Sequence, residues 1–213
     1  MNKIIIFDFD GVLVESVDIK TRAFVRLFEP EGKAVAEKVK NYHLKNTGVS
    51  RFEKFRFIYK GILKRDLSEN AFRALCDRFS ALVVEEVIKA PYVPGAKEFL
   101  DAHASCYKCY VASATPQDEI EDIIKKRGMT RYFSGIYGAP KDKDAIVKDV
   151  LEKNHISARE AVYVGDALSD YTAAAGHGVR FIARVRGDEA VFSGIDCVKI
   201  NDLVDLKGTI DKL

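Results

Sequence analysis

The pattern of apolar and polar positions divides the chain into three parts. Residues 4–7 (Ile-Ile-Ile-Phe) are continuously apolar and mostly β-branched, which is typical of a parallel strand buried on both faces. Between about residues 15 and 90, apolar residues instead recur at helical spacing. One helix is expected to begin after its cap Ser68, with Phe72 and Leu75 on its apolar face. The segment 15–90 is therefore predicted to be helical.

From Pro94-Gly95 onward, strand-like and helix-like segments alternate. Strands are predicted at 107–112, 133–137, 161–164, 179–183 and near 197–200, and helices at 96–103, 116–127, 144–154 and 169–177. Such alternation indicates right-handed βαβ units and a parallel sheet. The predicted fold class is α/β, with a parallel-sheet core in residues 1–14 and 91–213 that an all-helical insert at 15–90 interrupts.

Composition narrows the classes of partner. Of the 213 residues, 47% are hydrophobic and 31% are charged, enough for a core without disulfides or structural metals. No segment approaches the ~18 consecutive apolar residues of a membrane span, and the run at 4–7 is too short for a signal peptide. We therefore expect a cytoplasmic protein with no membrane partner. The net charge of +2 gives no indication of a nucleic-acid partner.

Charge is distributed unevenly along the chain. The insert carries 16 Lys and Arg against 11 Asp and Glu, so it is basic beside an acidic remainder. This distribution is expected if an anionic ligand lies between the two parts. It is equally expected for a solvated helical surface rich in lysine.

Two carboxylates follow the first predicted strand directly. Asp8 and Asp10 are separated by one residue, and Gly11 frees the backbone behind them. One carboxylate can attack phosphorus to form an aspartyl-phosphate, and its neighbour can exchange protons with the leaving group and with water. The alternative is an Asp-Gly hairpin turn in which residues 12–14 return as the partner strand.

Polar residues also follow the later strands. Ser113 stands after the strand at 107–112, where a hydroxyl near a helix N-terminus can bind an oxyanion. Thr115 is expected to cap the following helix, which would leave Ser113 for a ligand. Lys141 and Lys143 precede the helix at 144–154, and either could neutralise a phosphate, although most lysines are merely surface residues.

A further pair of carboxylates follows the strand at 161–164. Asp166 and Asp170 are four residues apart, one helical turn, so they face the same side. Carboxylate oxygens suit Mg²⁺, although both residues could simply begin and cap the next helix. Because ligands bind at the carboxyl edge of a parallel sheet, the conjunction of these strand-end segments favours one catalytic site over separate coincidences.

These segments, in this order, closely resemble the haloacid dehalogenase superfamily of phosphohydrolases over about residues 3–200. The motif Asp-Phe-Asp-Gly-Val-Leu at 8–13 is the most specific part of the resemblance. The helical insert directly behind it is similar to the cap of the phosphoglycolate phosphatase and β-phosphoglucomutase-like subgroup. The resemblance implies a Rossmann-like core, an inserted cap and Mg²⁺ as cofactor.

The resemblance also implies roles for individual residues. It makes Asp8 the nucleophile and Asp10 the general acid/base, and it gives the phosphoryl group to Ser113, Ala114 and Lys143, with Lys141 as the reserve lysine. It makes Asp8, Asp10 (through its carbonyl), Asp166 and Asp170 the magnesium ligands. Asp10 argues against a true dehalogenase, because halide leaves without needing a proton.

The insert is expected to select the substrate. If a helix begins at Ser50, Arg51 and Lys54 share one face, and we hypothesise that they bind a second anionic group of the substrate. The alternative is a basic amphipathic helix packed through Phe52, Phe55 and Tyr59.

We therefore expect a Mg²⁺-dependent phosphatase, monomeric or homodimeric, that hydrolyses a small phosphorylated metabolite through an aspartyl-phosphate. A sugar phosphomutase and a non-enzymatic interaction module are the alternatives on the same fold.

Overall fold

The apolar strands predicted from the sequence assemble into one parallel sheet. The computed structural model describes residues 4–187 and 189–213; residues 1–3 of the predicted core segment, and residue 188, lie outside the described residues. The six strands lie in the order β3-β2-β1-β4-β5-β6, and every neighbouring pair is parallel. Their bounds are β1 Ile4–Phe7, β2 Lys108–Pro116, β3 Phe133–Ala139, β4 Ala161–Gly165, β5 Arg180–Arg184 and β6 Val198–Ile200.

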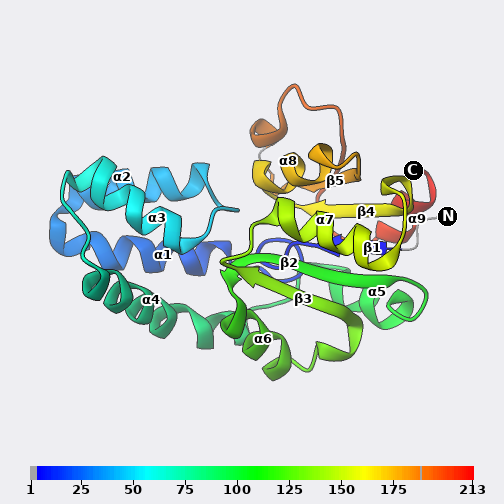
Figure 1. Ribbon diagram of the computed structural model, residues 1–213, viewed down its shortest axis with the longest axis horizontal. Coiled ribbons are helices and arrows are strands. Elements are labelled where there is room, and N and C mark those ends of the chain that lie inside the picture. Colours follow the sequence, from blue (N-terminus) through cyan, green and yellow to red (C-terminus); the bar gives the residue numbers. More distant parts are fainter. Residues whose placement is uncertain (1–3, 188) are drawn as a thin grey trace.

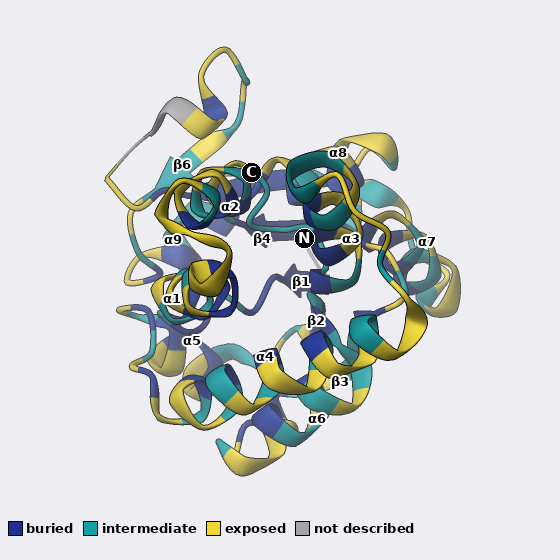
Figure 2. Ribbon diagram, turned by 90° about the vertical axis from the view of Figure 1, so that its left-hand side faces the viewer, coloured by how far each residue is buried: buried dark blue, intermediate teal, exposed yellow. Residues whose placement is uncertain are grey.

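Helices cover both faces of this sheet. Their bounds are α1 Val17–Phe28, α2 Lys33–Lys45, α3 Arg51–Phe57, α4 Glu69–Lys89, α5 Ala96–His103, α6 Gln117–Lys126, α7 Lys143–Asn154, α8 Leu168–Gly176 and α9 Leu206–Asp211, with a π-helical segment at Ile58–Leu63. Alternate β1 side chains enter two different apolar clusters. Ile5 and Phe7 pack with residues of α5, α6 and α9. Ile4 and Ile6 pack with residues of α7 and α8. In Figure 2 the central strands β1 and β4 are dark blue, whereas the outer helices carry yellow, exposed residues.

The helices α1 to α4 lie together beyond the carboxyl ends of the strands, and both termini lie at the opposite end of the molecule (Figure 1). The two segments that connect the sheet core to these helices lie side by side. Glu15 N donates to Pro91 O at 3.0 Å, and Val14 forms an isolated bridge with Tyr92. The strand ends therefore face the helical segment. The exact boundaries at residues 15 and 90 stay a prediction.

The predicted α/β fold is confirmed, with small shifts at element ends. Ser68 caps α4 as expected, since its side chain accepts a hydrogen bond from Ala71 N. The hairpin alternative for the first motif is wrong, because β1 pairs in parallel with β2 and β4 rather than with residues 12–14. No helix among the described residues combines the length and the apolar character that crossing a membrane requires.

Arg127, just after α6, ties the end of α4 to the core. Its Nη1 donates to the carbonyls of Val87, Ile88 and Ala90 at 2.7 to 2.9 Å. The guanidinium also lies 4.4 Å from the centre of the Tyr92 ring. These are carbonyls at a helix C-terminus, which have no partner within the helix and are stabilised by a cation.

We predict that Arg127→Met lowers the free energy of unfolding by about 1–3 kcal/mol, the range for hydrogen bonds from a charged donor. Urea denaturation measures this change. The control Arg73→Met removes an exposed arginine paired with Glu69 at i,i+4 on α4, and should cost about 0.5 kcal/mol or less. Equal effects of the two substitutions would contradict this role of Arg127.

Candidate active site

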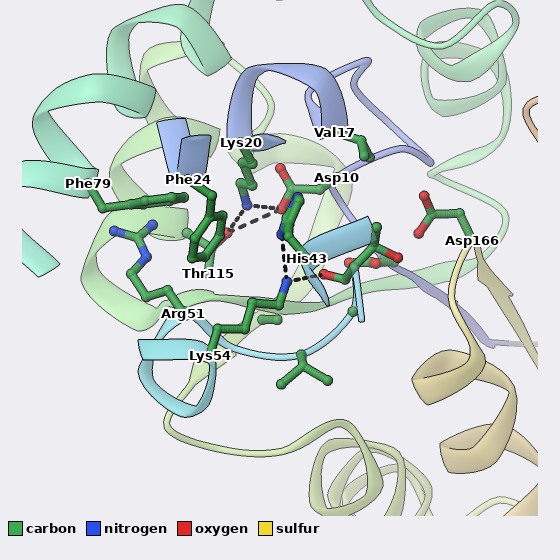
Figure 3. Close-up of a pocket in the computed structure, with 15 residues that line it drawn as sticks. Asp10, Val17, Lys20, Phe24, His43, Arg51, Lys54, Phe79, Thr115 and Asp166 are labelled. Atoms are coloured by element: carbon green, nitrogen blue, oxygen red, sulfur yellow. Dashed lines mark hydrogen bonds and ion pairs between the residues drawn. The ribbon is translucent and has the colours of Figure 1, made fainter. Parts of the chain in front are cut away.

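Several of the predicted site residues line a small cavity between the sheet and the helical segment, whereas Ser113 and Lys143 line a neighbouring pocket. Asp8, Asp10 and Asp166 line the small cavity from the sheet side, and α1 and α3 close it from the other (Figure 3). Its volume is about 40 Å³, on a measure by which one water needs roughly 10–15 Å³. The described structure is therefore closed, with space for only a few waters.

Asp8 ends β1 and is almost completely buried, with 3% of its surface exposed. Its Oδ1 accepts a hydrogen bond from Phe9 N at 2.7 Å, and its Oδ2 accepts one from Lys143 Nζ at 2.9 Å. Burial raises the pKa of Asp8 to about 7, with Asp170 and Asp10 adding to the rise and Lys143 opposing it. Lys143 is thus the cation that favours the ionised form a nucleophile needs.

Lys143 also joins Asp8 to Asp170. Its Nζ donates to Asp170 Oδ1 at 2.6 Å, and Tyr163 OH donates to the same oxygen at 2.7 Å. Ala167 N donates to the other oxygen of Asp170 at 3.0 Å, at the start of α8. Lys141 instead forms an ion pair with Asp149. Of the two lysines that the sequence left open, Lys143 is therefore the one at the site.

Three carboxylates at this edge fit a divalent cation. Asp8, Asp166 and Asp170 each offer an oxygen, and these oxygens lie within 4.8 Å of one another. Burial, with Asp8 and Asp170 nearby, raises the pKa of Asp166 well above its usual range, and Asp166 has no ion-pair partner among the described residues. An excess of negative charge on hard oxygen ligands is the donor set that Mg²⁺ prefers.

Gly11 allows this approach. Its φ is +78°, and a Cβ there would stand 2.2 Å from Asp166 Oδ2. A side chain at position 11 would therefore both strain the turn and collide with the carboxylate. The glycine after the two aspartates permits close contact between the first and the last motif.

Asp10 is held by residues of the helical segment and of β2. Its Oδ1 accepts from Ser16 Oγ at 2.6 Å, and its Oδ2 accepts from Lys20 Nζ and from Thr115 Oγ1, the latter at 3.2 Å. Burial alone would raise the pKa of Asp10, but Lys20 and these hydrogen bonds outweigh it and lower the pKa. Asp10 is thus a carboxylate in this closed form, which suits a general base. Its predicted contact with the metal through the carbonyl stays a prediction.

The C-terminal part of β2, which contains Ser113 and Thr115, differs in one respect from the prediction. Ser113 is fully buried, and its Oγ accepts a hydrogen bond from Thr115 N at 3.1 Å. The predicted helix cap at Thr115 is wrong: Thr115 belongs to β2, Pro116 is the residue before α6, and the Thr115 hydroxyl donates to Asp10 instead. Ala114 lines the cavity. The phosphoryl-binding roles of Ser113 and Ala114 stay predictions.

Helix α3 begins after Ser50, whose side chain accepts a hydrogen bond from Glu53 N. Arg51 and Lys54 are buried on the same face, as their spacing predicts, and both line the cavity. The Arg51 guanidinium forms an ion pair with Glu119 of α6, whereas Lys54 contacts His43. Their common role in binding a second anionic group stays a prediction.

Sequence reasoning gave no role at the site to three residues that touch the candidate catalytic carboxylates, namely Lys20, Thr115 and Tyr163. Lys20 could have been found, because it lies one helical turn after Ser16 in a helix that begins directly behind the first motif. Tyr163 lies in the middle of a buried strand and gave no signal, because its hydroxyl donates to Asp170, which belongs to another element.

Comparison with known proteins agrees with this geometry. The model of the haloacid dehalogenase-like hydrolase family matches residues 5–184. The chain belongs to the haloacid dehalogenase-like hydrolases. It is 26% identical over 184 residues to a phosphorylated carbohydrates phosphatase of Thermotoga maritima (84% of this chain, 82% of the relative). It is 25% identical over 182 residues to a phosphoglycolate phosphatase of Vibrio parahaemolyticus (81% and 78%).

A solved β-phosphoglucomutase of Clostridium difficile shares the fold of this haloacid dehalogenase-like hydrolase, with a TM-score of 0.80 at 17% identity over 100% of this chain and 96% of the other. The predicted family and the prediction of an enzyme are confirmed. These findings argue against the alternative of a non-enzymatic interaction module. The predicted cytoplasmic location and the monomeric or homodimeric state stay predictions.

We predict that Mg²⁺ at about 100 times its Kd stabilises this hydrolase by roughly 2.7 kcal/mol, which raises Tm by about 5–10 °C. Thermal melts with and without Mg²⁺ measure this shift. Asp166→Asn should remove at least half of it, because one of the three clustered oxygens loses its charge. The control Asp77→Asn, on the exposed surface of α4, should keep the full shift. A melt insensitive to Mg²⁺ would show that the cluster binds no such ion.

Proposed function

We propose that this protein is a Mg²⁺-dependent phosphatase that hydrolyses a small phosphate monoester through an aspartyl-phosphate on Asp8. The observation that carries the proposal is the buried Asp8 carboxylate paired with Lys143, at the strand ends where Asp166 and Asp170 also lie. The phosphatase relatives from Thermotoga maritima and Vibrio parahaemolyticus support the same reaction class.

The residues divide the reaction between them. An Asp8 oxygen attacks phosphorus, the ester oxygen leaves, and water then attacks the aspartyl-phosphate to release inorganic phosphate. In this proposal Lys143, which donates to Asp8, neutralises charge on the phosphoryl oxygens, and the buried Ser113 hydroxyl donates to one of them. Positioning and charge neutralisation supply most of the catalysis in phosphoryl transfer.

Asp10 handles protons in both halves of this reaction. As a carboxylate it takes a proton from the attacking water in the second half. In the first half it gives a proton to the leaving oxygen, which requires the low pKa set by Lys20 to rise when the anionic substrate enters. Asp166 and Asp170, with Asp8, would hold Mg²⁺, and the bound ion would offset the phosphate's negative charge.

The helical segment acts as a cap in this proposal. The closed cavity of about 40 Å³ is too small to admit an ester from solvent, so the segment must move for substrate to enter and product to leave. The linkers at Glu15 and Pro91, joined by a backbone hydrogen bond, are the places where such a movement would bend the chain. Closure then excludes bulk water from the aspartyl-phosphate.

A phosphomutase shares this fold and would retain the phosphoryl group rather than release it. A measurement of inorganic phosphate distinguishes the two functions, because only a phosphatase releases it in proportion to the ester consumed.

We predict that Asp8→Asn lowers phosphate release from p-nitrophenyl phosphate and from sugar phosphates by roughly 10³-fold or more, the scale expected for loss of a nucleophile. The matched control Asp18→Asn changes an 81% exposed side chain and should retain full activity. Phosphate release is followed in the presence of Mg²⁺, and circular dichroism confirms that both variants fold. Undiminished release by Asp8→Asn would overturn the proposed function.

We predict that Gly48→Ala lowers kcat/KM by roughly 10- to 100-fold, because small misplacements of catalytic parts have effects of this size. A Cβ at Gly48 would stand 2.0 Å from Ser169 Oγ and 2.8 Å from Ala167 Cβ, so the segment could not close fully on the core. The control Gly176→Ala meets only an ordinary contact at 3.4 Å. Equal kinetics of Gly48→Ala and the wild type would contradict cap closure of this kind.

A further inference from the structure

The basic side chains around the cavity differ in their partners. Lys20 pairs with Asp10, Lys143 pairs with Asp8 and Asp170, and Arg51 pairs with Glu119. Lys54 is 2% exposed and has no carboxylate partner within residues 4–187 and 189–213. A buried ammonium without a counter-charge is costly unless something supplies one.

The contacts of Lys54 leave one of its hydrogen-bond donors unused. Its Nζ contacts His43 Nδ1 at 3.0 Å and Thr47 O at 3.3 Å, and Figure 3 shows the first of these contacts. An ammonium carries three N–H groups, so the third has no acceptor among these contacts. Lys54 lines the cavity, which is where an acceptor can reach it.

His43 presents a second unused donor beside Lys54. Burial, together with Lys54 and Lys20, lowers the pKa of His43 to about 2, so the ring is neutral. Since Nδ1 accepts from Lys54, the proton lies on Nε2. This Nε2 is buried and has no hydrogen-bond partner, and His43 also lines the cavity. Two donors and no free acid thus mark this end of the cavity as a place for an acceptor-rich, anionic group.

The two terminal nitrogens of Arg51, in contrast, already donate hydrogen bonds to protein acceptors. Its Nη1 donates to Glu119 Oε2 at 3.0 Å and to Ser80 Oγ at 2.7 Å, and its Nη2 donates to Glu119 Oε1. Ser80 Oγ in turn donates to Glu119 Oε2 at 2.7 Å, which fixes the carboxylate. The pair is nearly buried, with side-chain exposures of 4% and 10%. Glu119 therefore accepts the hydrogen bonds that the Arg51 guanidinium could otherwise donate to a substrate anion.

We propose that Lys54, supported by His43, binds a carboxylate on the leaving group of the substrate and selects compact phosphate esters that carry one. The inference rests on the proposed phosphatase function and adds the class of ester. It separates the two cap residues expected to act together: Lys54 binds the substrate, whereas Arg51 pairs with Glu119 and holds the helical segment against the core.

The electrostatics of Lys54 support this assignment. Burial, with Lys20 and Lys143 nearby, lowers the pKa of Lys54 to about 7, and Asp10 and Asp166 offset only part of that effect. A substrate carboxylate would provide the opposite charge that the pocket lacks. The small cavity favours a compact ester in which the carboxylate lies a few bonds from the phosphate.

Paired esters of equal length test the proposal: 2-phosphoglycolate against 2-hydroxyethyl phosphate, and 3-phosphopropionate against 3-hydroxypropyl phosphate. The wild type should prefer the carboxylate ester of at least one pair by about tenfold or more in kcat/KM. Lys54→Met should reduce that preference by roughly ten- to hundredfold, the factor expected for loss of a charge-assisted hydrogen bond, mainly through KM.

Control variants separate charge from position. Arg56→Met removes an exposed cation from the same helix and should keep the preference of the wild type. Arg51→Met should also keep it. Thermal melts, and hydrolysis of p-nitrophenyl phosphate, verify that Lys54→Met is folded.

Two results would overturn the proposal. One is a wild type that hydrolyses both members of each pair equally. The other is a preference that survives Lys54→Met, and its disappearance in Arg51→Met would then assign the substrate contact to Arg51 instead. Absence of phosphate release from every ester, including p-nitrophenyl phosphate, would instead show that the phosphatase function itself is wrong.

Discussion

The site depends on one buried lysine placed between two carboxylates. Lys143 contacts both Asp8 and Asp170, while Asp166 adds a third carboxylate within the same small volume. Such a concentration of like charge in a buried position is unfavourable, and one ammonium offsets only part of it. The remaining excess is the reason the cluster fits a divalent cation. Burial, together with the neighbouring Asp8 and Asp170, raises the pKa of Asp166, the member without an ion-pair partner among the described residues.

The sheet makes this concentration possible. Strands β1 and β4 are adjacent, parallel and buried on both faces, so Asp8 and Asp166 emerge at the same edge. Lys143 reaches Asp8, and Asp170 beside it, from the start of α7, which packs on the Ile4 and Ile6 face of the sheet. The apolar packing of the strands thus holds the charged groups together against their mutual repulsion, in the closed form seen here.

The helical segment contributes a different part of the site. Its residues hold Asp10 through Ser16 and Lys20, and its α3 presents Arg51 and Lys54 to the cavity. In the proposed function, the core fixes where phosphorus would react, and the segment defines what would surround the leaving group. In a closed cavity this small, a change of a few atoms at Lys54 or Arg51, which both line it, alters the space and charge available to a substrate.

The sequence by itself determined the fold class and the strand ends where Asp8 and Asp166 lie, because apolar periodicity is a local property of the chain. It ended the strand before Ser113 too early, since β2 continues to Pro116. It also placed Arg51 and Lys54 on one helix face. It could not choose between Lys141 and Lys143. It also could not show that Thr115 and Tyr163 donate hydrogen bonds to Asp10 and Asp170, respectively. Nor could it show that Arg51 forms an ion pair with Glu119. Only the tertiary structure decided these points, because each depends on an ion pair or hydrogen bond between residues distant in the chain, whose formation depends on how whole elements pack.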